Sequence, residues 1–207
     1  STIATVTSAT YTVSAGATAS ETITAVPFGT SKAAFLAAVI AGEAHQARDA
    51  TNVSDPVVTG NTLVITAEDG ITVVTYTISV KPDAPVISSV ATDGFITLGE
   101  KAAIHVIGTA NPNALVSVTL TNGANSKSGT QQLSGGATAY DITLDGTAAT
   151  PAALADGTIS VSATATIASV VSTVTNASAT QDTVLPTVTK IGDGSADVVL
   201  AIGNTDL

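Results

Sequence analysis

Two runs of alternating apolar and threonine residues flank a single acidic corner in the stretch TGNTLVITAEDGITVVTYTISV, residues 59–80. Apolar residues at every second position place their side chains on one face of a β-strand. The Asp69-Gly70 pair between the runs is typical of a hairpin turn, because glycine readily adopts positive φ. The residues expected on the buried face are Leu63, Ile65, Ala67, Val74, Tyr76, Ile78 and Val80. The stretch predicts a β-hairpin with one face in a core.

The rest of the chain repeats this style. Hydrophobic residues make up 44% of the 207 residues, but aromatic residues are only 3% and charged residues only 11%, whereas an ordinary soluble domain carries about 25% charged residues. A core must therefore be built from small aliphatic side chains, and the abundant valine and threonine favour a pleated sheet. We expect an all-β chain that folds as tandem β-sandwiches.

One stretch, TSKAAFLAAVIAGEA, changes from the strand period to a helical one. Thr30 or Ser31 can cap a helix start and Gly42 can end it, which predicts a helix near residues 31–42. The apolar face of this helix would carry Phe35, Leu36, Val39 and Ile40. We expect that face to cover one end or side of a sheet.

The chain divides at KPDAP, residues 81–85, where two prolines favour an extended and stiff connection. We predict a first domain over residues 1–80 and a second over residues 86–182. The second has seven predicted strands: VISSVA, FITLGEKAAIHVIGTA, ALVSVTL, GTQQL, TAYDITL, GTISVSATAT and VVSTVTNASAT. This number of short strands with turns between them is typical of an immunoglobulin-type sandwich. Residues 183–207 would begin a third repeat or form an assembly strand at a neighbour's sheet edge.

Two groups of motifs resemble known families. LVITAEDGITVVTYTISV resembles the terminal hairpin of the cadherin-like β-sandwich repeats of bacterial cell-surface proteins, especially surface-layer (S-layer) proteins. HVIGTANPNALVSVTL, LADGTISVSATAT and QDTVLP resemble the immunoglobulin-like repeats of bacterial surface-layer proteins and large adhesins. The resemblance implies an extracellular, structural protein of the bacterial cell surface.

Charge and motif content weigh against several other functions. A net charge of −10 argues against nucleic-acid binding, which needs cations to neutralise phosphates. No apolar run is long enough to insert into a membrane. The sequence has no nucleophile elbow, phosphate-binding loop or zinc pattern, and we expect His45 and His105 to be ordinary surface residues. The expectation is that the chain is not an enzyme.

Aspartates accumulate in certain turns of the second domain. If the seven strands run alternately away from and toward the linker, the turns after strands one, three and five, and the exit after strand seven, share the pole far from the first domain. The aspartates there are Asp93, Asp145, Asp156 and Asp182. Calcium takes about six to eight oxygen ligands and suits such a group, which makes these four residues candidate calcium ligands. The alternative is that they serve only as good turn formers.

The sequence thus predicts a non-enzymatic segment of a self-assembling bacterial surface-layer protein, with calcium as a candidate stiffening ion. Its partners would be copies of itself in a lattice or fibre, and a cell-wall polymer contacted through parts outside this chain. Two alternatives stay open: the stalk of a bacterial adhesin, and a filament subunit that donates a terminal strand.

Overall fold

The computed structural model describes residues 1–16, 18–149 and 151–186, and these residues form β-strands and one short helix, which confirms the all-β prediction. The elements, in chain order, are β1 (Val6–Thr7), β2 (Thr12–Val13), β3 (Ser20–Pro27), α1 (Lys32–Ala38), β4 (Ile40–Ala41), β5 (Ala47–Asp49), β6 (Thr62–Thr66), β7 (Val73–Lys81), β8 (Val86–Val90), β9 (Phe95–Ile96), β10 (Ile104–Thr109), β11 (Leu115–Asn122), β12 (Asn125–Gln132), β13 (Ala139–Leu144), β14 (Gly157–Ile167), β15 (Val170–Val171) and β16 (Thr175–Gln181).

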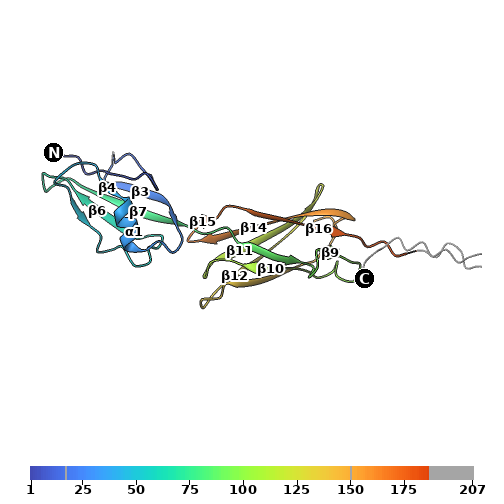
Figure 1. Cartoon of the computed structure of the whole chain (residues 1–207). Coiled ribbons are helices and arrows are strands. Elements are labelled where there is room, and N and C mark those ends of the chain that lie inside the picture. The colour runs from blue at the N-terminus through green and yellow to red at the C-terminus, as the bar shows by residue number, and fades with distance from the viewer. Residues whose placement is uncertain (17, 150, 187–207) are drawn as a thin grey trace, which may run out of the picture.

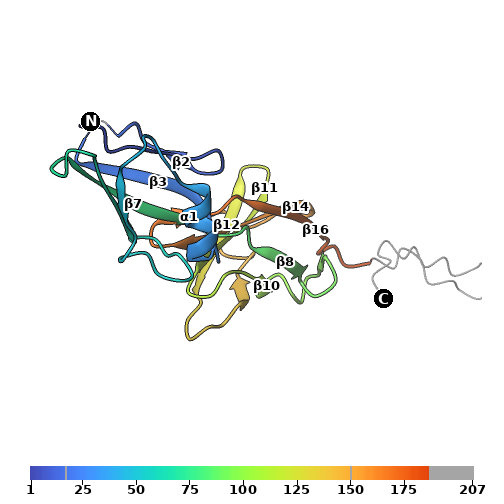
Figure 2. The same cartoon turned by 60° about the vertical axis from the view of Figure 1, so that its left-hand side comes forward.

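The buried apolar side chains gather in two clusters, one between Ala4 and Val80 and one between Val90 and Ala179. We call residues 1–80 the first unit and residues 86–182 the second unit. Figure 1 shows their sheets end to end along one long axis, and Figure 2 shows the same units turned by 60°, with the first unit brought toward the viewer. That each unit is an independently folding domain stays a prediction.

The first unit contains a five-stranded sheet in the order β2-β3-β7-β6-β5 and a separate two-stranded pair, β1 with β4. Strands β3 and β7 are parallel, while the other pairs of the larger sheet are antiparallel. Parallel neighbours need a long crossover connection. The chain between β3 and β7 supplies it and carries α1, β4, β5 and β6.

The predicted hairpin is present as β6 and β7. All seven residues expected on its inner face are buried. The loop between the strands covers residues 67–72, and the Ala67 amide donates to the Thr72 carbonyl at 2.9 Å. Gly70 lies inside this loop with φ of 70°, as the turn chemistry predicted.

The predicted helix is shorter than expected. Ser31 is its N-cap, with its hydroxyl accepting from the Ala34 amide, but the helix ends at Ala38 instead of reaching Gly42. Val39 is extended, and Ile40 pairs with Thr7 as part of β4, which leaves Ile40 62% exposed. The placement of Ile40 on a buried helix face was therefore wrong. Two adjacent β-branched residues favour the extended chain.

The helix nevertheless covers the core as predicted. Phe35 is fully buried in the first cluster, and its ring stacks on Tyr11 with centroids 5.6 Å apart. Arg48 holds the C-terminal end, because its Nη1 donates to the carbonyls of Leu36 and Val39 at 2.9 and 2.7 Å. These carbonyls have no partner within the helix, so the guanidinium group replaces the expected glycine cap.

The second unit has two sheets, in the orders β13-β10-β8 and β12-β11-β14-β16-β9, with β15 paired to β14. Residues 95–110, predicted as one long strand, are instead two strands in different sheets. The strand predicted over residues 170–180 is also divided, into β15 and β16. The Lys101 amide donates to the Thr97 carbonyl, and Glu100 Oε2 accepts from the amide and hydroxyl of Thr97. This turn moves the chain from one sheet to the other. The immunoglobulin-like and cadherin-like assignments stay predictions.

The linker between the two units is short, and hydrogen bonds attach it to the second unit. Lys81 still belongs to β7, so the irregular part of the linker begins at Pro82. The Asp83 amide donates to Asn111 Oδ1 at 2.7 Å, and Asn111 Nδ2 donates back to Asp83 Oδ2 at 2.9 Å. This reciprocal pair attaches the linker to the second unit, which adds to the stiffness expected from its two prolines.

The predicted third repeat or assembly strand covers residues 183–207. Thr183 to Pro186 are described and continue outward from the end of β16 (Figure 1), while residues 187–207 lie outside the described part of the chain. That prediction is therefore not tested by the fold.

Candidate functional site

Strand direction brings the four predicted aspartates to one end of the second unit. Strand β8 leads away from the linker, its antiparallel partner β10 returns, and β13, antiparallel to β10, leads away again. Strand β11 follows β10 and leads away from the linker. Its antiparallel partner β14 returns toward the linker, and β16, antiparallel to β14, leads away again. Asp93 follows β8, Asp145 follows β13, Asp156 precedes β14 and Asp182 follows β16. We call this end the acidic pole.

Three of these carboxylates are bonded within their own turns. Asp93 Oδ1 accepts from the Phe95 amide at 2.9 Å, and Asp182 Oδ1 accepts from the Val184 amide at 3.0 Å. Asp145 Oδ1 accepts from the hydroxyl and the amide of Thr147, and these two bonds lower the pKa of Asp145. Aspartate side chains in turns commonly accept such hydrogen bonds from the backbone amide two residues ahead.

Asp156 is different, because it bonds a segment far along the chain. Its Oδ1 accepts from the amide of Thr183 at 3.0 Å and from the hydroxyl of Thr183 at 2.8 Å. Desolvation raises the pKa of Asp156, but these bonds and one from Gln181 Nε2 outweigh it, so the net shift is downward. Asp156 therefore fixes the chain where it leaves the second unit.

The geometry does not gather these carboxylates around one point. Within residues 1–16, 18–149 and 151–186, no group of three or more His, Cys, Asp or Glu side chains could hold a metal ion. Gln181 is 1% exposed at the same pole, and its Oε1 has no hydrogen-bond partner among the described residues. Calcium binding by Asp93, Asp145, Asp156 and Asp182 stays a prediction.

One side of the second unit, along β12 and β13, is closed to further strands. Lys127 lies on the edge strand β12 but points inward and is only 5% exposed, where its ammonium donates to the carbonyls of Ala148 and Pro151. Gln131 Oε1 accepts from the Asp141 amide at 2.8 Å and so occupies a backbone donor of the other edge strand. Inward-pointing charges and covered edges are devices that prevent edge-to-edge pairing.

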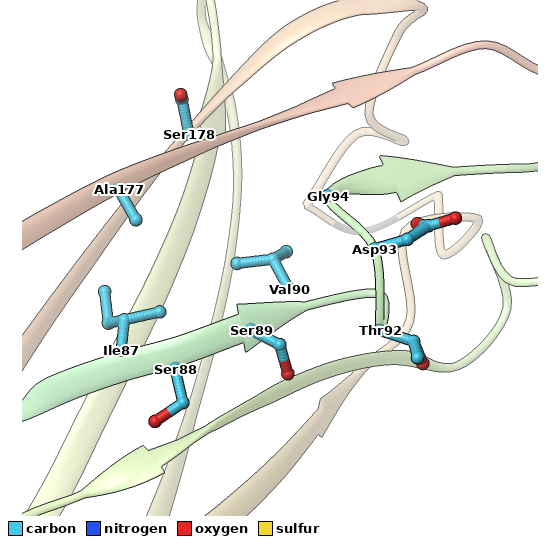
Figure 3. Close-up of a pocket in the computed structure, with 9 residues that line it drawn as sticks. All are labelled: Ile87, Ser88, Ser89, Val90, Thr92, Asp93, Gly94, Ala177 and Ser178. Atoms are coloured by element: carbon cyan, nitrogen blue, oxygen red, sulfur yellow. The ribbon is translucent and has the colours of Figure 1, made fainter.

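The opposite side, along β8 and β16, is open. A groove of about 290 Å³ lies between the two strands. Figure 3 shows Ile87, Val90 and Ala177 directed toward the space between the strands, while Ser88 and Ser178 point away from it. Among the described residues that line the groove, Asp93 at its end is the one with an ionisable side chain. We call this feature the β8–β16 groove.

The sequence alone did not predict this groove, because β8 and β16 have the same alternating pattern as other strands of the sandwich. A signal was present in the sequence. Charged residues and prolines usually protect an edge strand from pairing, and the segments VISSV and NASA contain neither. Strand order was needed to recognise the edges.

The two histidines are surface residues, as predicted. His105 on β10 faces solvent, and its Nδ1 lies 2.8 Å from Asp141 Oδ1 on the neighbouring strand β13. His45 lies in an exposed loop with φ of 70°. Over the described ranges, no helix combines the length and apolar character needed to cross a membrane.

Comparison with known proteins gives only distant similarities. No protein-family model and no curated protein matches the chain. Among solved structures, it is similar to a Ca²⁺-stabilised adhesin that helps an Antarctic bacterium reach out and bind ice, with 20% identity over 62% of this chain and a TM-score of 0.33. It is also similar to a tetra-tandem repeat in the extending region of a large adhesion protein, with 19% identity over 61% of this chain and a TM-score of 0.35.

A third similar structure is domains 4 and 5 of the S-layer protein SbsC, with 12% identity over 68% of this chain and 78% of that chain, and a TM-score of 0.27. The chain spans 33% of the length of each of the two adhesin structures. TM-scores at this level do not establish a shared fold.

Proposed function

We propose that this chain is a non-enzymatic, structural segment of a bacterial surface-layer protein that acts outside the cell by assembling with copies of itself. Its two units would serve as spacers and contact surfaces within a lattice. The sequence resemblances to surface-layer repeats motivate the family, and the fold supports a mechanical role.

The observation that carries this proposal is the end-to-end arrangement of two β units across a short, bonded linker (Figure 1). The reciprocal bonds between Asp83 and Asn111, together with two prolines, limit rotation at the joint. The Thr175 hydroxyl also donates to the Pro85 carbonyl, which attaches the last strand of the second unit to the linker. An extended body with a restrained joint can hold a fixed spacing between its neighbours.

The two alternatives also use an extended β chain. An adhesin stalk would hold a distant binding tip away from the cell and would not associate laterally. A filament subunit would donate a terminal strand to the next copy and form a linear fibre. The open β8–β16 groove could accept the strand that a filament subunit donates. The shape of the assembly distinguishes the stalk and the filament subunit from a two-dimensional lattice.

Electron microscopy of the purified chain, with millimolar calcium and with a chelator, tests the proposal. Two-dimensional sheets in either condition are the expected result. Single rods at every concentration would favour the stalk, and unbranched fibres would favour the filament subunit. Either of these outcomes would contradict the lattice proposal.

Calcium binding at the acidic pole is the finer part of the proposal. If the pole binds calcium only when folded, the intact chain melts at a higher temperature with millimolar calcium than with chelator. Linkage gives a gain of about 2.7 kcal/mol at a free ion concentration 100 times the dissociation constant. Calorimetric melting measures it.

Two variants separate calcium binding from turn chemistry. Asp182→Ala should abolish the calcium-dependent gain, whereas Asp49→Ala, which changes a carboxylate bonded to Thr51 in the first unit, should leave the gain intact. Identical melting of the intact chain in calcium and in chelator would mean that the four aspartates only stabilise turns.

A further inference from the structure

We propose that the β8–β16 groove accepts a β-strand supplied by the C-terminal segment of a second copy of this chain. The inference rests on the proposed function in that it names the contact through which copies associate. The donated strand is residues 198–202, with the sequence VVLAI. The groove would be filled by a strand only when two copies of the chain associate.

Both walls of the groove are strands with one unpaired edge. Strand β8 pairs with β10 on one side and has no other neighbour in the sheet order of the described residues. Strand β16 pairs with β14 along its length, but its other edge meets β9 only at Thr180 and Gln181. Backbone amides and carbonyls along such edges form a ready template for an added strand.

The open length of the groove is limited at both ends. Near the linker, the Thr175 hydroxyl bonds the Pro85 carbonyl and bridges the two walls. At the far end, the Gly94 carbonyl accepts from the Thr180 amide where β9 begins. The intervening residues 86–90 of β8 admit a strand of about five residues, or about 16 Å at 3.3 Å per residue.

The side chains that point into the groove favour an uncharged, apolar strand. Ile87 and Val90 on one wall and Ala177 on the other direct aliphatic side chains into the groove (Figure 3). A charged side chain placed there would be desolvated without a partner.

The chain itself contains a segment of that chemistry and length. Val198 to Ile202 is an uninterrupted run of five apolar residues, and it lies between Asp197 and Gly203. In an extended conformation, Val198, Leu200 and Ile202 share one face, while the smaller pair Val199 and Ala201 share the other. The larger face would enter the groove.

The position of β9 favours a neighbour's segment over the chain's own. A segment that turned back directly after β16 would first pair at Thr180 and Gln181, but β9 already occupies that edge. The Ile96 carbonyl also accepts from the Asp182 amide, just beyond the strand. An ordinary hairpin return is therefore blocked. Residues 187–197 separate Pro186 from the donated strand, and a fully extended chain of that length spans about 36 Å.

The other edges of the second unit are poorer acceptors. On the β12 and β13 side, the buried Lys127 ammonium and the bond from Asp141 to Gln131 already close the edge. A strand added there would have to displace these contacts. The β12 edge therefore serves as the control site for experiments on the β8–β16 groove.

Disulfide trapping tests the contact directly, because the chain contains no cysteine. One full-length preparation carries Ser178→Cys on the outward face of β16, and a second carries Ala201→Cys on the outward face of the donated strand. Mixed and oxidised, they should form a disulfide between copies. The control pairs Ala201→Cys with Thr130→Cys, which lies exposed on β12, and should form none.

Two further substitutions test the direction of donation. Leu200→Asp on the copy that carries Ala201→Cys should abolish the disulfide, since a carboxylate cannot enter the apolar groove. Ala177→Lys on the copy that carries Ser178→Cys should do the same by filling the groove. The opposite placements, Leu200→Asp on the acceptor copy or Ala177→Lys on the donor copy, should leave the disulfide intact.

Several results would overturn the inference. They are equal trapping by Thr130→Cys, no trapping at any concentration, or no effect of Leu200→Asp on the donor. A chain with both cysteines that closes only on itself would show that the segment returns to its own groove. Sheets that still form with Leu200→Asp would leave the surface-layer proposal standing without this contact. Trapping without sheets or larger assemblies would retain the contact and reject the lattice.

Discussion

Replacing Phe35 with alanine is expected to lower the free energy of unfolding of the first unit by about 3–5 kcal/mol. The Phe35 ring is fully buried and stacks on Tyr11, with an interplanar angle of 22°. Its removal leaves a cavity that a short helix of seven residues cannot close by shifting, because Arg48 bonds its C-terminal carbonyls. The first unit has few aromatic side chains to compensate.

Calorimetry and limited proteolysis measure this effect and test the division into two units at the same time. If the units fold independently, Phe35→Ala lowers the melting temperature of one transition and leaves the other unchanged, and proteolysis of the variant leaves a resistant fragment that begins near Asp83. The matched control is Ile40→Ala, which removes an aliphatic side chain that is 62% exposed. Its cost should stay within about 0.5 kcal/mol. A single transition shifted as a whole would contradict independent folding.

The features that the sequence predicted best are those set by local period. The hairpin of β6 and β7 follows strict alternation, so each apolar residue had one possible face, and all seven expected residues are buried. The all-β class follows from the same alternation across the chain. Strand direction in the second unit was also predictable, because successive antiparallel strands reverse direction.

The errors have causes that lie far away in sequence. The helix was expected to continue through Val39 and Ile40, but residues Val6 and Thr7, more than thirty positions earlier, pair with β4 and hold it extended. The long predicted strand over residues 95–110 is divided because Phe95 and Ile96 pair with β16, some eighty-five positions later. Period alone cannot reveal such partners.

The site shows the same limit. Counting strands placed four aspartates at one end, but it could not show that Asp156, through Thr183, holds the exit segment. Nor could it show the β8–β16 groove, because an edge strand and an interior strand can have the same sequence pattern. The edge is defined by what does not pair with it, which only strand order reveals.

Replacing Gly108 with alanine is expected to destabilise the second unit by about 2–4 kcal/mol, the sum of an overpacked core and one lost hydrogen bond. A Cβ atom at Gly108 would collide with the Val86 carbonyl oxygen and lie 2.5 Å from the Tyr140 hydroxyl and 2.6 Å from its Cζ. The Tyr140 hydroxyl donates to that same carbonyl at 2.9 Å. Strand β8 must therefore move away from β10, or the tyrosine must leave its buried site.

Gly99→Ala is the matched control, because the nearest atom to a new Cβ there is Thr97 Oγ1 at 3.9 Å, and its effect should stay within about 1 kcal/mol. Gly108 opposes Ile87, at the register shift between β10 and β8, and Ile87 lines the β8–β16 groove. A displaced β8 should thus also weaken trapping of the Ala201→Cys copy by the Ser178→Cys copy, measured below the melting temperature of the variant. Normal stability of Gly108→Ala would contradict the close packing of β8 on β10. Lost stability with undiminished trapping would show that the donated strand contacts β16 and not β8.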